Sequence, residues 1–160
     1  MAKIIIISGT PASGKKTVAK LLSKKYKILD VKEISKKCKV GYDRKLKCDI
    51  IDDKKLIKEL VKIIKKNKED LVIASHLSHL IPAKYVDLCI ITKCNLKVLK
   101  KRLEKRKYSK EKIKENLECE IFDICLNEAK ERKHKILIVD TTKGCNQKGI
   151  LKCLERKKSR

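Results

Sequence analysis

Apolar positions along the chain fall into two alternating patterns, short continuous runs and runs with helical spacing. Continuous runs over residues 4–8, 71–74, 86–92 and 136–139 predict strands, and a shorter run that ends near Asp30 predicts one more. Helical patterns separate these strands. Because a strand–helix alternation favours a parallel sheet covered by helices on both faces, the sequence predicts an α/β fold with five parallel strands in three layers.

Amphipathic patterns between the strands predict the helices. The first predicted helix begins near Lys15, and a weak one covers residues 32–39. Further helices are predicted over 56–64, from Val98 to about 107–109, as one long stretch over 109–129, and around residues 150–154. Residues 40–43 are interpreted as a turn, and residues 156–160 as a solvated, charged tail. No repeat or linker interrupts the pattern, so residues 1–160 are predicted to form a single domain.

The composition is strongly basic. Lys and Arg number 44 against 20 Asp and Glu, which gives a net charge of +24, and charged residues make up 40% of the chain, compared with about 25% in typical soluble domains. A basic surface of this kind concentrates polyanions such as RNA. The alternative is an AT-rich genome or a thermophilic source, because the chain is rich in Ile and Lys and has no Trp. The composition leaves both explanations open.

The eight cysteines contain no C-x-x-C pair, and with three scattered histidines they give no zinc-site spacing. The first strand begins directly after residue 3, so no signal peptide is expected, and no apolar run approaches the roughly 18 residues of a membrane span. We therefore expect a cytoplasmic, monomeric protein without membrane contact, whose thiols are reduced and mostly buried.

A phosphate-binding loop is the strongest chemical motif. Gly9, four further residues, Gly14 and Lys15 follow the first strand and open a helix, as in the pattern G-x-x-x-x-G-K-[ST]. Such a loop aims backbone N–H groups and a helix N-terminus at a polyphosphate. The hydroxyl that normally follows the lysine and ligates Mg²⁺ is replaced by Lys16, and Thr17 comes one place later.

Together with this loop, further motifs resemble the adenylate kinase isoenzyme 6 family over nearly the whole chain. They are Gly41-Tyr42-Asp43, His76-Leu77-Ser78-His79-Leu80, Arg102-Leu103-Glu104-x-Arg106-x-Tyr108, Glu115-Asn116-x-x-x-Glu120 and Asp140-Thr141-Thr142. The resemblance implies a P-loop nucleoside monophosphate (NMP) kinase fold, with an NMP-binding segment at about 30–51 and a short lid at about 105–115. It implies transfer of a phosphoryl group from ATP to AMP or another NMP with Mg²⁺. It also implies slow ATP hydrolysis and a role in maturing the small ribosomal subunit, through contact with a small-subunit ribosomal protein and pre-ribosomal RNA.

Phosphoryl transfer depends mainly on positioning and on cancellation of negative charge. The expected catalytic residues are Lys15, Arg106, His76 and Arg102. Arg102 and Arg106 are four apart on one helix face, where both could offer planar donors from the lid side, or pair with surface acids instead. The expected nucleotide-binding residues are Gly9, Ala12, Gly14, Lys15, Lys16, Thr17 and Arg106. Tyr42 either stacks on a base or anchors a turn, and His79 and His134 are expected to be structural.

The chain departs from the family pattern on the metal side. Lys16 replaces the Mg²⁺-ligating hydroxyl, and Ala74 stands where the family has an aspartate two residues before His76; Ala12 stands where Gly is common. Thr17 could move into the ligand position, Lys16 could itself neutralise phosphate charge, or catalysis could have decayed. We expect nucleotide binding to be retained and transfer to be reduced.

Three functions therefore compete at this point. The first is an adenylate kinase-type enzyme, the second a nucleotide-switched ribosome-assembly factor, and the third a basic RNA-binding protein on a kinase scaffold. The enzyme requires both ATP and AMP to form ADP. The assembly factor and the RNA-binding protein differ in whether affinity for the ribosomal or RNA partner depends on ATP or only on salt.

Overall fold

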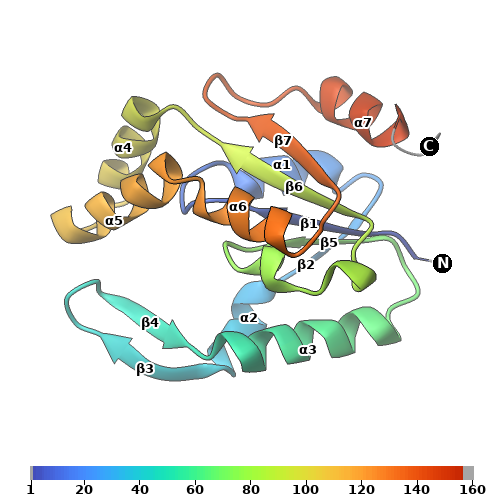
Figure 1. The fold of residues 1–160 in the computed structure, drawn as a ribbon, viewed down its shortest axis with the longest axis horizontal. Coiled ribbons are helices and arrows are strands. Elements are labelled where there is room, and N and C mark those ends of the chain that lie inside the picture. The colour runs from blue at the N-terminus through green and yellow to red at the C-terminus, as the bar shows by residue number, and fades with distance from the viewer. Residues whose placement is uncertain (1, 157–160) are drawn as a thin grey trace.

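The computed structural model describes residues 2–156, and a parallel sheet forms its centre (Figure 1). Its strands are β1 (Ile4–Ser8), β2 (Lys27–Leu29), β5 (Leu71–Ala74), β6 (Leu88–Lys93) and β7 (Ile136–Asp140), in the order β2-β5-β1-β6-β7. All four pairings are parallel. The predicted five-stranded parallel sheet is confirmed.

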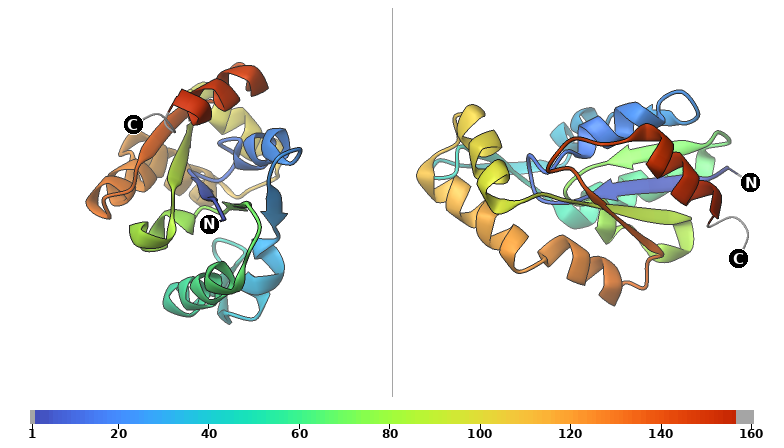
Figure 2. Two further views of the ribbon diagram at one scale, coloured as in Figure 1. Left: turned by 90° about the vertical axis from the view of Figure 1, so that its right-hand side faces the viewer. Right: turned by 90° about the horizontal axis from the view of Figure 1, so that it is seen from above.

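Strand β1 anchors the layers on both faces of the sheet. Because successive side chains point to opposite faces, Ile4 and Ile6 pack into one cluster and Ile5 and Ile7 into another. The first cluster lies under α2 (Val31–Lys36), α3 (Asp53–Lys66) and α6 (Ile124–Glu131), and the second under α1 (Lys15–Leu22) and α7 (Gln147–Arg156). Figure 2 shows the helices on both sides of the sheet. Each fully buried isoleucine contributes roughly 2 kcal/mol by leaving water, so this one strand ties three layers together.

A third, smaller cluster lies beside the loop that follows β1. It joins Ala12 to Cys94, Leu99 and Leu103, with flanking residues from α4 (Leu96–Lys105) and α5 (Lys110–Ile121). These two helices therefore pack against the loop itself, which fixes their position relative to any ligand bound there.

The segment predicted as a turn at 40–43 is a strand, so that prediction was wrong. Strand β3 (Lys39–Asp43) pairs antiparallel with β4 (Cys48–Ile51), and the chain reverses at residues 44–47. There the Asp43 carboxylate accepts hydrogen bonds from the N–H groups of Lys45 and Leu46. An Asp that binds the backbone two residues later stabilises a turn, whereas Gly41 sits at an irregularity in the ladder.

The long helix predicted over 109–129 is divided in two, which is a second correction. Helix α5 ends at Ile121, and Asp123 takes a left-handed conformation with φ of 51° before α6 begins. The Asp123 carboxylate binds the ammonium of Lys93, whose Nζ also donates to the carbonyl of Glu120 at 3.1 Å. The Lys93 ammonium, at the end of β6, thus stabilises the interruption between α5 and α6. The apolar periodicity of residues 109–129 cannot reveal this partner.

Other differences are small. Helix α2 ends at Lys36, before the expected residue 39, and β6 begins at Leu88, after two short 3₁₀ helices, η1 (Ser78–Leu80) and η2 (Ala83–Tyr85). All eight cysteines are free thiols, but only Cys38, Cys89 and Cys94 are buried, so the expectation of mostly buried thiols was wrong. Residues 157–160 of the charged tail lie outside the described residues. Within residues 2–156, every helix is too short or too polar to cross a bilayer.

Candidate nucleotide-binding site

The loop between β1 and α1 can be made only with glycine at its two ends. Gly9 has φ of 151° and Gly14 has φ of 97°, in the range that side chains disfavour. A Cβ on Gly9 would lie 2.7 Å from both Ser13 Oγ and the Thr92 carbonyl oxygen, and a Cβ on Gly14 would lie 2.9 Å from Thr141. Gly14 is also the residue before α1, where no side chain caps the helix. The first amides of α1 are therefore available to an anion.

Ala12 also has a positive φ, of 66°. A left-handed conformation costs a non-glycine residue about 1–2 kcal/mol, and the Ala12 methyl recovers part of this in the cluster with Leu99 and Leu103. A glycine at this position would avoid that cost, and the loop keeps its path with Ala12 in its place.

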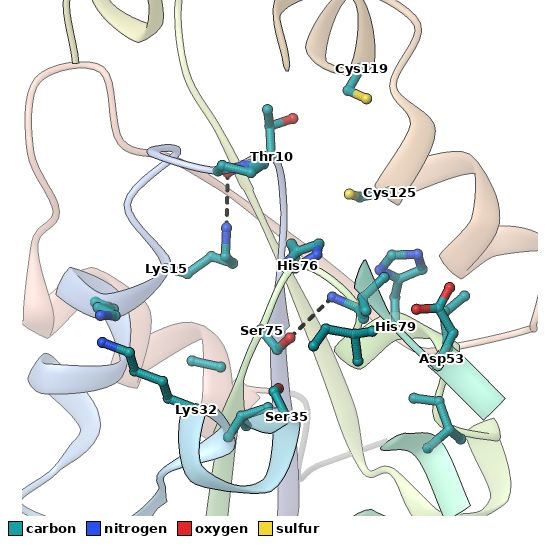
Figure 3. Close-up of a pocket in the computed structure, with 18 of the residues that line it drawn as sticks. Thr10, Lys15, Lys32, Ser35, Asp53, Ser75, His76, His79, Cys119 and Cys125 are labelled. Atoms are coloured by element: carbon teal, nitrogen blue, oxygen red, sulfur yellow. Dashed lines mark hydrogen bonds between the residues drawn. The ribbon is translucent and has the colours of Figure 1, made fainter. Parts of the chain in front are cut away.

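The Lys15 ammonium lies inside the curve of the loop. Its Nζ donates to the carbonyl oxygens of Gly9 at 2.8 Å and Thr10 at 2.9 Å, and Figure 3 shows the second of these bonds. Burial is the main cause that lowers the pKa of Lys15 to about 8, and the positive charges of Arg106 and Lys16 act in the same direction. A buried cation of this kind gains most from an anionic partner.

Glu120 holds the loop from the opposite side. It is a buried carboxylate on α5, and it accepts hydrogen bonds from Thr10 Oγ1 at 2.7 Å and from the Cys94 N–H at 3.0 Å. Lys93 completes the network with an ion pair to Glu120 at 3.1 Å. Because hydrogen bonds to a charged group are the strong ones, Glu120 ties the loop to β6 and α5.

The two arginines of α4 lie in different surroundings. The Arg102 guanidinium donates to the carbonyl oxygens of Ala12 at 3.3 Å and Thr141 at 2.7 Å, and to Thr141 Oγ1 at 3.1 Å. Arg106 is exposed at the end of α4 and lines the cleft in front of Lys15. Arg102 thus braces the loop from behind, while Arg106 faces the cleft, and catalytic use of either arginine stays a prediction.

A large cleft of about 1780 Å³ opens in front of the loop. Its walls come from α1, α2, the β3–β4 hairpin, α3, the segment after β5, the end of α4, α5 and α6. Figure 3 shows Lys15, His76, Cys119 and Cys125 around this space. Tyr42 is 53% exposed and lies outside the cleft lining, with Lys39 over its ring at 5.6 Å.

The two histidines after β5 have different environments. His76 lines the cleft and remains accessible, while desolvation and the charge of Lys15 lower its pKa below the usual 6.5. Near neutral pH its imidazole is thus uncharged. His79 is 2% exposed and bridges Ser8 Oγ and Glu128, each at 2.6 Å. His134 is buried and its Nε2 lies 2.9 Å from the His79 carbonyl oxygen, so both match the expected structural roles.

The positions on the metal side of the loop are now defined. Lys16 is exposed and lines the cleft, whereas Thr17 is exposed and does not line it. Ala74 ends β5, the strand beside β1, and also lines the cleft. Of the expected nucleotide-binding residues, Lys15, Lys16 and Arg106 therefore come together in the cleft with His76. Gly9, Ala12 and Gly14 shape the loop behind them.

Comparison with known proteins agrees with this geometry. The family model described as an AAA domain matches residues 5–123. A protein of Methanocaldococcus jannaschii named "Putative adenylate kinase" is 38% identical over 142 residues, which cover 86% of this chain and 76% of the relative. The "Adenylate kinase isoenzyme 6 homolog" of Caenorhabditis elegans is 31% identical over 132 residues, with coverage of 79% and 72%.

The chain belongs to the adenylate kinase isoenzyme 6 family. Its fold also resembles that of the shikimate kinase of Acinetobacter baumannii, solved in complex with shikimate, with a TM-score of 0.62 over 100% of this chain and 97% of that chain. The sequence identity to that structure is 14%, so this likeness concerns the fold alone.

In this member of the adenylate kinase isoenzyme 6 family, two site residues were not assigned a role from sequence. Glu120 lies in the quoted Glu115–Glu120 motif and Thr141 in the Asp140–Thr142 motif, and both turn out to hold the loop. The Thr141 Oγ1 donates to the Ser13 carbonyl oxygen at 2.5 Å. A sequence signal existed for Glu120, because an acid four residues after Asn116 lies on the same, buried face of α5.

Proposed function

We propose that the chain is a nucleoside monophosphate kinase of the adenylate kinase type, which transfers a phosphoryl group from ATP to AMP and yields two ADP. The observation that carries this proposal is the half-buried Lys15 ammonium, held by the carbonyl oxygens of Gly9 and Thr10 at the edge of a cleft large enough for two nucleotides. The names of the curated relatives support the same reaction class.

Within the cleft, the residues divide into a phosphate side and an acceptor side. Lys15, the N-terminus of α1 and Arg106 surround the position of the transferred group, where they would offset its charge. His76, uncharged near neutral pH, can donate or accept a hydrogen bond without adding a further cation. No side chain is required as a strong base, because transfer depends on alignment and charge.

We assign the acceptor to residues 30–51 and the lid to residues 105–115. Support comes from the cleft lining, which includes Asp30, Lys32, Cys48 and Ile51 from the first segment. From the second segment it includes Arg106, Tyr108, Lys112 and Glu115. Lys112 Nζ lies 4.0 Å from the centre of the Tyr108 ring, so one cation of the lid is stacked on an aromatic side chain.

A coupled assay for ADP tests the proposal. ADP should form only when ATP and AMP are both present. Lys15→Met should lower turnover by at least about 100-fold, the scale expected when a preorganised donor to a developing charge is lost. Lys24→Met is the matched control, since Lys24 is exposed and outside the cleft. ADP formation at an equal rate without AMP would reduce the activity to ATP hydrolysis and contradict the kinase assignment.

A second function, favoured by the net charge of +24, is a role with ATPase activity in maturing the small ribosomal subunit. The chain would then contact a ribosomal protein and RNA as a cytoplasmic monomer. Pull-down of small-subunit components at moderate salt should be lost in Lys15→Met if nucleotide gates docking. Retention that falls with salt and ignores ATP would instead indicate simple polyanion binding.

A further inference from the structure

The strand ends and hydroxyl groups around the phosphate loop do not fit a magnesium ion. In P-loop enzymes the ion is held by the nucleotide phosphates, by the hydroxyl directly after the loop lysine and by a carboxylate at a neighbouring strand end. In this chain the residue after Lys15 is Lys16. The strands on either side of β1 end in Ala74 and Lys93. An ammonium, a methyl group and a second ammonium occupy these three places, and none can ligate a cation.

The remaining hydroxyls of the loop are engaged within the protein. Ser8 Oγ binds His79 at 2.6 Å, Thr10 Oγ1 binds Glu120 at 2.7 Å, and Ser13 Oγ binds Thr92 Oγ1 at 2.6 Å. Thr17 lies outside the cleft lining. Ser75 does line the cleft, but its Oγ already accepts from the Leu77 N–H at 3.2 Å. One neutral oxygen without a neighbouring carboxylate is a poor site for a hard divalent cation.

The acidic side chains of the cleft come from elements other than the loop and α1. They stand before α2, on β4, in the first turn of α3, on α5 and on α6: Asp30, Asp49, Asp53, Glu115 and Glu128. Three of them have partners already. Asp30 caps α2 at Lys32 N, Asp49 pairs with Lys39 at 2.6 Å and Glu128 binds His79. Among the described residues, no group of three or more His, Cys, Asp or Glu is placed to hold a metal ion.

Lys16 has the opposite character from the residue it replaces. Its ammonium has no hydrogen bond or ion pair within residues 2–156, and it lines the same cleft as Lys15. Burial is the main cause that lowers the pKa of Lys15, and the positive charge of Lys16, the next residue in the chain, acts in the same direction. A polyphosphate bound along the loop would relieve the repulsion between them.

We propose that Lys16 takes over the charge-balancing role of magnesium, so that this protein binds the metal-free nucleoside polyphosphate as its preferred ligand. The inference rests on the proposed function, since it concerns the form of nucleotide that the phosphate loop selects. Metal-free nucleotide carries its full phosphate charge, which the magnesium complex partly cancels. A loop with two ammonium groups and no metal ligand therefore favours the former.

Calorimetric titration of the full-length protein with ATP tests the proposal, in EDTA and again in excess Mg²⁺. The wild-type chain should bind at least as tightly in EDTA as in Mg²⁺. Lys16→Thr, which restores the hydroxyl, should weaken binding in EDTA by about tenfold, as expected for a lost hydrogen bond to a charged group. Lys24→Thr removes one exposed charge outside the cleft and should change neither titration.

A double variant, Lys16→Thr with Ala74→Asp, adds the missing carboxylate at the end of β5. It should bind ATP at least about tenfold more tightly with Mg²⁺ than without it. Because Ala74 is half-buried, thermal unfolding should confirm that this variant folds. The single variant Lys16→Thr changes only an exposed residue, so it decides the matter if the double variant does not fold.

The outcomes separate this inference from the proposed function. Wild-type binding that requires Mg²⁺, or metal-free binding unchanged in Lys16→Thr, would overturn the inference and leave the kinase intact. Absence of ATP binding under both conditions would overturn the kinase function and the inference with it. Binding in EDTA that depends on Lys16 supports both.

Discussion

The phosphate loop and the β3–β4 hairpin border the same cleft, yet they are held in opposite ways. Every side of the loop is attached to another element, through Glu120 on α5, Arg102 on α4 and Thr141 after β7. The hairpin depends on one antiparallel ladder, and its apolar residues Val40 and Tyr42 are 66% and 53% exposed. Figure 1 shows it extending from the N-terminal end of α3, beside the body of the molecule.

This difference indicates a division of labour within the site. The loop must present amides and an ammonium at fixed positions, since transfer is sensitive to small displacements. The hairpin only forms one wall of the cleft. Its base is anchored by a hydrogen bond of 2.9 Å from the Asp52 N–H to the carbonyl oxygen of buried Cys38. Substitutions in the two regions should therefore differ in the free energy of unfolding.

The largest expected effect is that of Gly9→Ala. The added Cβ would contact Ser13 Oγ and the Thr92 carbonyl oxygen at 2.7 Å; Ser13 Oγ is held by a hydrogen bond to Thr92 Oγ1, and Thr92 lies in β6. We expect a loss of about 3 kcal/mol or more in the free energy of unfolding, measured by urea denaturation. Gly144→Ala is the control, because Gly144 also has a positive φ but an open space around it. Equal losses in the two variants would mean that the contacts at Gly9 do not matter.

The next effect is that of Glu120→Gln. The substitution keeps the shape of a buried side chain but removes its charge, which weakens the bonds from Thr10 and Cys94 and removes one of the two ion pairs of Lys93. We expect about 2–3 kcal/mol of destabilisation. Glu118→Gln, two residues away on the exposed face and 4.0 Å from Lys114, should cost less than about 0.5 kcal/mol. Similar losses in both variants would contradict the bracing role of Glu120.

Nucleotide affinity should also depend on pH through Lys15. Its pKa of about 8 lies below the usual 10.5 because of burial, and a bound polyphosphate raises the pKa by stabilising the ammonium. Binding is therefore accompanied by proton uptake. The affinity should be constant below about pH 8 and fall by up to about tenfold per pH unit above it. Titrations between pH 7 and 9.5 measure this, and Lys15→Met should abolish the dependence. An affinity that rises with pH would contradict it.

The smallest effect is expected at the hairpin, in a matched pair of substitutions. Val40→Thr replaces a methyl by a hydroxyl at a 66% exposed position of β3 and should cost less than about 0.5 kcal/mol. Val72→Thr makes the same change at a fully buried position of β5 and should cost about 1–3 kcal/mol. Thermal unfolding compares the two directly. A large cost at Val40 would show that the hairpin packs more firmly than its exposure indicates.

The sequence predicted the elements that depend on local pattern and missed those that depend on distant partners. The isoleucine run of β1, the spacing of α3 and the loop from Gly9 to Lys15 were all predicted at close to their observed positions. The break at Asp123 was missed because Lys93 lies thirty residues away. The strand β3 was missed because Gly41 was interpreted as a turn residue. The turn lies after it, where the Asp43 carboxylate accepts a hydrogen bond from the Lys45 N–H.

For the candidate site, the residue types were predicted and their orientations were not. Lys15 follows from a motif whose backbone geometry is local, and the unusual Lys16 and Ala74 can be read directly from the sequence. The separation of Arg102 from Arg106 required the fold. Residues four apart on a helix share a face. Only the hydrogen bonds to Thr141 and Ala12 place the Arg102 guanidinium behind the loop, while Arg106 lines the cleft in front of it.

By itself, the sequence determined the family, the phosphate loop and the chemistry at its metal side, because each is set by residue identity over a short span. Tertiary structure alone decided which side chains face the cleft and which hold the loop in place. Hydrogen bonds such as Thr10 to Glu120 join residues 110 positions apart. Contacts of this kind form only when the sheet brings its strand ends together at one edge.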